Sequence, residues 1–108
     1  MEKNIKFEYQ GTTYVLEFTK RTRKQMEERG FNATELISAP MVVLPELFRG
    51  AFLANHKYAK KDLVDEMFEK FTNKEALLDK LVALYAEPLK EMMADPEEGN
   101  GIEWDASF

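Results

Sequence analysis

Residues 5–18 decide the fold class of this chain, and they read IKFEYQGTTYVLEF. Apolar and polar side chains alternate on both sides of Gln10-Gly11, as the period of two in a half-buried strand requires. A two-residue turn at Gln10-Gly11 predicts a β-hairpin over residues 4–18, with its apolar side chains on one face. The predicted pairs are Tyr9 with Thr12, Phe7 with Tyr14 and Ile5 with Leu16. An isolated hairpin is marginal in water, so this face must pack on the segments that follow.

Those following segments are predicted to be helical. Apolar periodicity, capping residues and prolines predict four helices, over residues 20–29, 44–57, 61–71 and 74–94. Pro45 is expected in the first turn of the second helix, and Asn73 is expected to cap the longest one. Gly50 costs helix stability relative to Ala, which is tolerable where another backbone approaches closely. Pro88 interrupts an apolar stripe that continues beyond it, which predicts a kink rather than a stop.

The chain of 108 residues is 44% hydrophobic and 32% charged, which is typical of a folded domain. We expect an α+β fold that is mainly α, with the N-terminal β-hairpin packed on a small bundle of about four helices. One globular domain is predicted over residues 1–95, followed by an acidic linker and an aromatic tail over residues 96–108. No apolar run is long enough to span a membrane, and the N-terminus has no signal-peptide core, so a cytoplasmic protein is expected.

The sequence offers little chemistry for catalysis. It contains no cysteine, which excludes disulfides, thiol nucleophiles and cysteine-based zinc sites. His56 is the only histidine and has no other ligand at metal-binding spacing, so we interpret it as the C-terminal residue of a helix, favoured by the helix dipole. Carboxylates such as Asp62 and Glu66 fall on a polar helix face and are interpreted as solvated. No catalytic, metal-binding or cofactor-binding residue is predicted, and an enzyme is not expected.

A nucleic-acid partner is not favoured by the charge balance. The formal net charge is −5, from 15 Lys+Arg against 20 Asp+Glu, whereas nucleic-acid binding needs clustered positive charge. A short basic run does occur over residues 20–24, with Glu27 and Glu28 close enough to neutralise it. A small DNA-binding regulator therefore stays as an alternative, which salt-dependent DNA affinity would reveal.

The C-terminal tail is the most informative feature of the sequence. It places the only tryptophan, Trp104, and the terminal Phe108 beyond a linker rich in Gly and Pro. Two interpretations stay open: the tail folds back to complete the domain, or it docks on a partner through aromatic anchors. The candidate partner-binding residues are Trp104, Phe108, Ile102, Met92 and Met93.

The sequence resembles the small tail assembly chaperones of tailed phages and prophages of Gram-positive hosts. The resemblance covers nearly the whole chain and is one of overall pattern, without a catalytic signature. It rests on the segments IKFEYQG at 5–11, a basic helix ending at Gly30-Phe31, LPELFRGAF at 44–52, YAEP at 85–88 and WDASF at 104–108.

This resemblance implies a function in tail morphogenesis. Chaperones of this family are thought to bind the long, aggregation-prone tape measure protein and to keep it soluble while tail-tube protein polymerises around it. It implies the tape measure protein as partner, with tail-tube protein and a homo-oligomer as further possible partners, in the bacterial host cytoplasm. An alternative of another class is a structural tail or head-tail connector component, which would remain in the virion.

Overall fold

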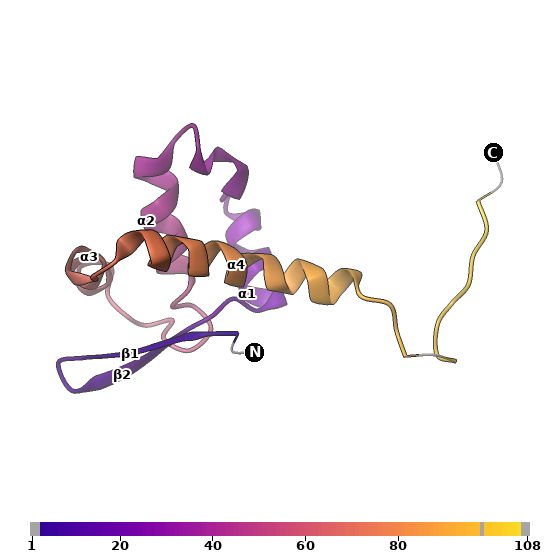
Figure 1. Ribbon diagram of the computed structural model, residues 1–108, viewed down its shortest axis with the longest axis horizontal. Helices are drawn as coiled ribbons and strands as arrows, with labels where there is room; N and C mark the ends of the chain where they lie inside the picture. The colour runs from indigo at the N-terminus through magenta and orange to yellow at the C-terminus, as the bar shows by residue number, and fades with distance from the viewer. Residues whose placement is uncertain (1–2, 98, 107–108) are drawn as a thin grey trace.

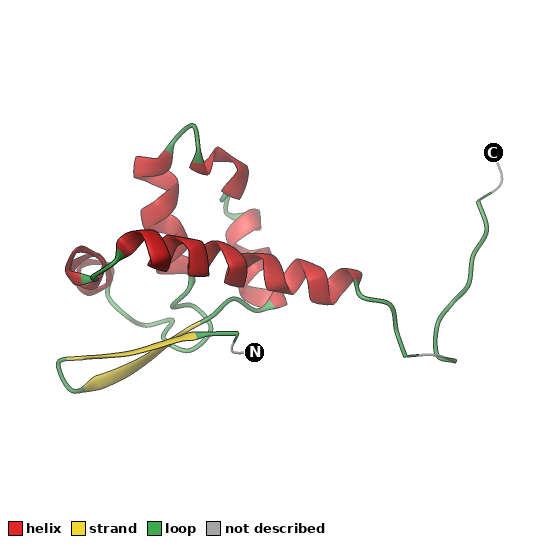
Figure 2. Cartoon of the chain, in the orientation of Figure 1, coloured by secondary structure: helices red, strands yellow, loops and turns green. Residues whose placement is uncertain are grey.

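The computed structural model describes residues 3–97 and 99–106. A β-hairpin is followed by helices that pack across one another, and the long α4 runs over them (Figures 1 and 2). This confirms the predicted α+β fold with mainly helical content. The elements are β1 (Ile5–Tyr9), β2 (Thr12–Leu16), α1 (Lys20–Glu28), the 3₁₀ helix η1 (Ala33–Leu36), α2 (Pro40–Gly50), α3 (Lys61–Lys70) and α4 (Lys74–Met93).

The hairpin has the predicted antiparallel register. Phe7 pairs with Tyr14 and Ile5 with Leu16 across the two strands. Gln10 and Gly11 both have positive φ, at 50° and 81°. Two consecutive positive φ values produce the mirror-image turn whose twist matches that of paired strands, and this explains why glutamine is tolerated there.

The apolar face of the hairpin packs on the helices and forms one core with them. The Phe7 ring stacks on Tyr14 with centroids 5.3 Å apart and meets Phe71 edge-on at 4.8 Å. Aromatic pairs of this kind add stability beyond the area they bury. The most completely buried large side chains are Phe48, Leu16, Met67 and Leu81.

The second helix differs from its prediction over residues 44–57, because α2 begins at Pro40 and ends at Gly50. Pro40 occupies the first turn, where a missing N–H costs nothing, so Pro45 lies inside the helix and not in its first turn. A Cβ at Gly50 would collide with the Met26 side chain of α1. The expectation that another backbone approaches Gly50 is therefore wrong, because the group that lies there is the Met26 side chain.

The longest helix agrees with its prediction in most respects. α4 continues through Pro88 to Met93 without stopping. Asn73 occupies the N-cap position, yet its φ is 53° and its side chain makes no capping hydrogen bond. Proline lacks the N–H that would bond the Leu84 carbonyl. Beside that gap, Arg23 of α1 donates from Nη1 to the Tyr85 carbonyl oxygen at 3.0 Å and lies over the Tyr85 ring.

Candidate protein-binding surfaces

The apolar stripe of α4 extends past the domain core. Leu84, Tyr85 and Pro88 are buried, whereas Met92 and Met93, one turn further on, are exposed. Leu89, which is 45% exposed, lies between the buried and the exposed parts of the stripe. Because the stripe continues while the covering elements do not, α4 presents unpaired apolar side chains at its C-terminal end.

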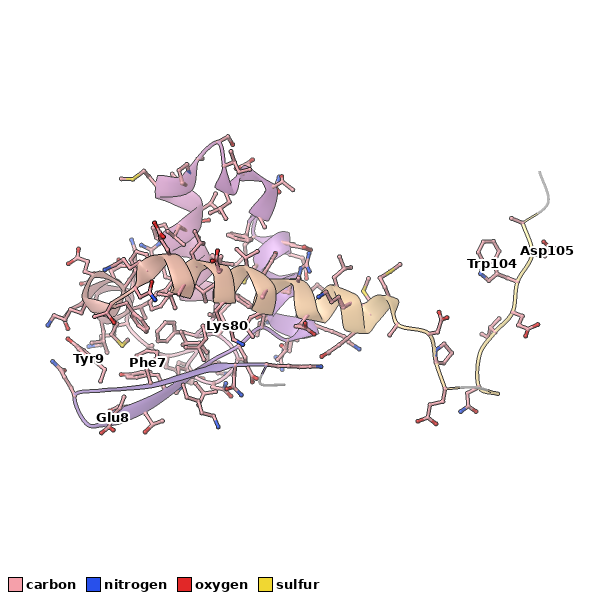
Figure 3. All side chains as sticks on the ribbon, viewed as in Figure 1. Phe7, Glu8, Tyr9, Lys80, Trp104 and Asp105 are labelled. Atoms are coloured by element: carbon pink, nitrogen blue, oxygen red, sulfur yellow. The ribbon has the colours of Figure 1, made fainter. Side chains whose placement is uncertain are left out.

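An arm, formed by residues 94–97 and 99–106, continues from that end and points away from the domain (Figure 1). Ile102 is 92% exposed and Trp104 is 82% exposed. Figure 3 shows Trp104 and Asp105 well clear of the helices. Within the described residues, the arm thus does not fold back to complete the core. Phe108, the other predicted aromatic anchor, lies outside the described residues.

A groove of about 230 Å³ lies between α1 and the C-terminal half of α4. α4 contributes Pro88, Leu89 and Met92 to its lining, and α1 contributes Lys20, Arg23 and Lys24. One side is therefore apolar and the other is basic. Glu27 also lines the groove and is paired with Arg23 at 3.2 Å.

A second apolar surface was not predicted from the sequence. Residues 36–45, which we call the apolar lobe, cover the end of η1 and the first half of α2 and project from the top of the view in Figure 1. Ile37 is 94% exposed, and Met41 and Val42 are exposed beside it. The sequence did contain a signal for this surface, because these ten positions include no charged residue.

His56 does not end a helix, so its predicted role at a helix C-terminus is wrong. It lies in the loop between α2 and α3, where its Nε2 accepts a hydrogen bond from the Val15 N–H at 2.9 Å. The neighbouring Asn55 donates from Nδ2 to the Val15 carbonyl oxygen at 3.1 Å. These two side chains satisfy the outer edge of β2, so the histidine has a structural role in pairing the loop with the hairpin.

Shifted pKa values belong to pairs that join elements of the domain. Hydrogen bonds from Arg49 of α2 lower the pKa of Asp65 in α3, with N–O distances of 2.8 and 3.1 Å. Burial, followed by the charge of Glu27, raises the pKa of Tyr85. The hydrogen bond to Tyr9 raises the pKa of Lys70, and the Tyr9 hydroxyl donates to Glu66 at 2.6 Å. Each pair links two elements, which is typical of structural rather than reactive groups.

Two kinds of site are absent from the described part of the chain. Across residues 3–97 and 99–106, no group of three or more His, Cys, Asp or Glu side chains could hold a metal ion. Nor does any helix in these ranges have both the length and the apolar content to cross a membrane. The apolar surfaces described above are the arm with the end of α4, the groove beside them and the apolar lobe.

Comparison with known proteins adds the family of the chain. No curated protein matches it, and no solved structure does. A family model described as a domain of unknown function, DUF5055, matches residues 1–108. The chain therefore belongs to the DUF5055 family.

Proposed function

We propose that this protein is a non-enzymatic phage tail assembly chaperone that binds the tape measure protein during tail morphogenesis. The observation that carries the proposal is the arm, on which Ile102 and Trp104 are exposed beyond the folded domain. The resemblance of the sequence to tail assembly chaperones supplies the class of partner.

The chemistry of the arm suits reversible binding of a protein. A tryptophan offers roughly 150–250 Å² of surface for burial and is enriched among residues that dominate interface energies. Met92 and Met93, exposed at the root of the arm, add flexible and polarisable side chains that adapt to varied apolar partners. A long helical client with apolar stripes would bury these side chains without a chemical reaction.

The alternative of a DNA-binding regulator receives less support from the charges. The exposed positions of α3 include Asp62, Glu66 and Glu69, and phosphates would repel this face. Lys20 and Lys24 offer positive charge on α1, yet they lie beside an apolar groove rather than in a broad basic surface.

The test is co-expression with the tape measure protein of the same phage or prophage, followed by affinity capture. We expect a soluble complex, with the client insoluble when it is expressed alone. Replacing both Ile102 and Trp104 by Ala should weaken capture about tenfold or more, because the apolar anchors are lost. Tyr58→Ala is the matched control, since Tyr58 is an equally exposed aromatic residue away from the arm.

Two outcomes would overturn the proposal. Failure to capture the client, with this protein present in purified tails, would favour a structural tail or head-tail connector component. Failure to capture it, with DNA affinity that falls as salt rises, would favour the regulator.

A further inference from the structure

Two cations that line the groove between α1 and α4 form no ion pair with any residue that the structure describes. Arg23 is engaged by Glu27 and by the Tyr85 carbonyl oxygen. Lys20 and Lys24, in contrast, form no ion pair with any residue in 3–97 or 99–106. Lys20 is the first residue of α1, whose first turn has no acidic residue, and Lys24 follows one turn later. The helix dipole makes a cation unfavourable at Lys20, so an acidic occupant would be stabilised there both by the ammonium group and by the dipole.

The arm has the complementary charge. Residues 95–108 contain five carboxylates and no Lys or Arg, and the formal net charge of the whole chain is −5. The remaining residues, 1–94, therefore have no formal net charge, with 15 basic and 15 acidic side chains. Glu103 and Asp105 flank Trp104 directly. The arm thus combines an apolar anchor with two carboxylates. The groove combines an apolar side with two ammonium groups that form no ion pair within residues 3–97 and 99–106.

The direction of the arm favours a groove on another copy of the protein over the groove of the same chain. Ala94 is extended, with ψ 142°, and Pro96 restricts the residue before it to extended conformations. The arm consequently continues outward from the end of α4 (Figure 1), and the turn that the Asn100 N–H makes with the Glu97 carbonyl oxygen comes after it has left the domain. Trp104 lies well clear of the helices of its own chain in Figure 3.

We propose that the arm of one copy seats in the α1–α4 groove of a second copy. Trp104 packs against Leu89 and Met92, and Glu103 and Asp105 lie beside Lys20 and Lys24. The contact joins two different surfaces, so it is heterologous and generates a ring or an open chain of copies. It needs no client, and it keeps the arm covered until a client competes for it.

The first experiment follows the full-length protein by sedimentation velocity and by tryptophan emission. Trp104 is the only tryptophan, so the emission reports on this residue alone. At low ionic strength we expect association that increases with concentration, and a blue shift of the emission that follows it. Salt should reverse both changes, because exposed charge pairs are screened. A protein that stays monomeric, with water-exposed emission at every concentration, would overturn the proposal.

Charge-reversal variants distinguish binding of the arm to a second copy from binding of the arm to its own chain. The variants K20E/K24E and E103K/D105K should each associate about tenfold or more weakly, because like charges then face each other. Mixing the two variants should restore association, since each arm now matches the groove of the other variant. K57E/K60E is the control for K20E/K24E, because it lowers the net charge by the same amount at exposed lysines outside the groove.

The remaining outcomes are also decisive. If mixing does not restore association, the arm does not bind the groove of a second copy. If the emission is blue-shifted in a monomer at every concentration, the arm binds its own chain and the proposal is wrong. Self-association is measured without a client. A negative result there would overturn this proposal and leave the proposed binding of a client to be tested by capture.

Discussion

The two halves of α4 carry the same kind of apolar stripe and differ in what covers it. Leu77, Leu81 and Tyr85 lie before Pro88 and are buried. Met92 and Met93 continue the stripe after Pro88 and are exposed. In the first half, the rings of Phe18 and Phe31 pack edge-on against Tyr85. In the second half, α1 lies beside Pro88, Leu89 and Met92 but leaves an open groove. Periodicity therefore predicts which face of a helix is apolar, and the rest of the fold determines whether that face is buried.

The sharpest test of this comparison is a Leu→Ala substitution in each half of α4. Leu81 is 0% exposed and Leu89 is 45% exposed. Leu81→Ala should lower the free energy of unfolding by about 2–5 kcal/mol, because it leaves a cavity in the core. Leu89→Ala should lower it by less than about 1 kcal/mol, since the site is already open to solvent. Urea unfolding of both variants measures the difference, and equal losses would show that the second half of α4 is covered in solution.

The fold was largely predictable because its decisive signals are local. The alternation of residues 5–18 predicted both the hairpin and its register, and the turn at Gln10-Gly11 fixed that register. The start of α2 was missed because Pro45 looked like a first-turn proline, while Pro40 holds that position. The predicted candidates Ile102 and Trp104 are exposed, yet what they contact depends on a partner, and no periodicity encodes a partner.

The role of His56 could not be predicted, since its partner lies 41 positions away in the sequence. His56→Phe should keep the ring beside Tyr14 but remove the acceptor of the Val15 N–H. An amide left without its acceptor costs roughly 1–3 kcal/mol, and this one is only partly buried, so we expect about 1–2 kcal/mol. Amide hydrogen exchange at Val15 should also become faster. Tyr58→Ala, nearby and exposed, should change neither quantity.

The Arg49–Asp65 pair, which joins α2 to α3, should make the free energy of unfolding depend on pH. Because the folded protein holds the pKa of Asp65 below its usual range, this stabilisation is present above the usual pKa and is lost as pH falls through the lowered value. Both side chains are about a third exposed or more, so Asp65→Asn should cost only about 0.5 kcal/mol at pH 7. The difference from the unsubstituted protein should shrink towards pH 3. An unchanged difference at pH 3 would mean that charge is not its source.

Removal of residues 96–108 should have the smallest effect on stability and the largest on binding. The described part of the arm adds no residue to the buried core, so its deletion should change the free energy of unfolding by less than about 0.5 kcal/mol. A loss above about 1 kcal/mol at concentrations where the protein is monomeric would show that the arm packs on its own domain. If the free energy of unfolding is unchanged while self-association and client capture are lost, the apolar side chains of the arm stabilise contacts between chains. The core before Pro88 and the arm after it would then use similar side chains for folding and for binding, respectively.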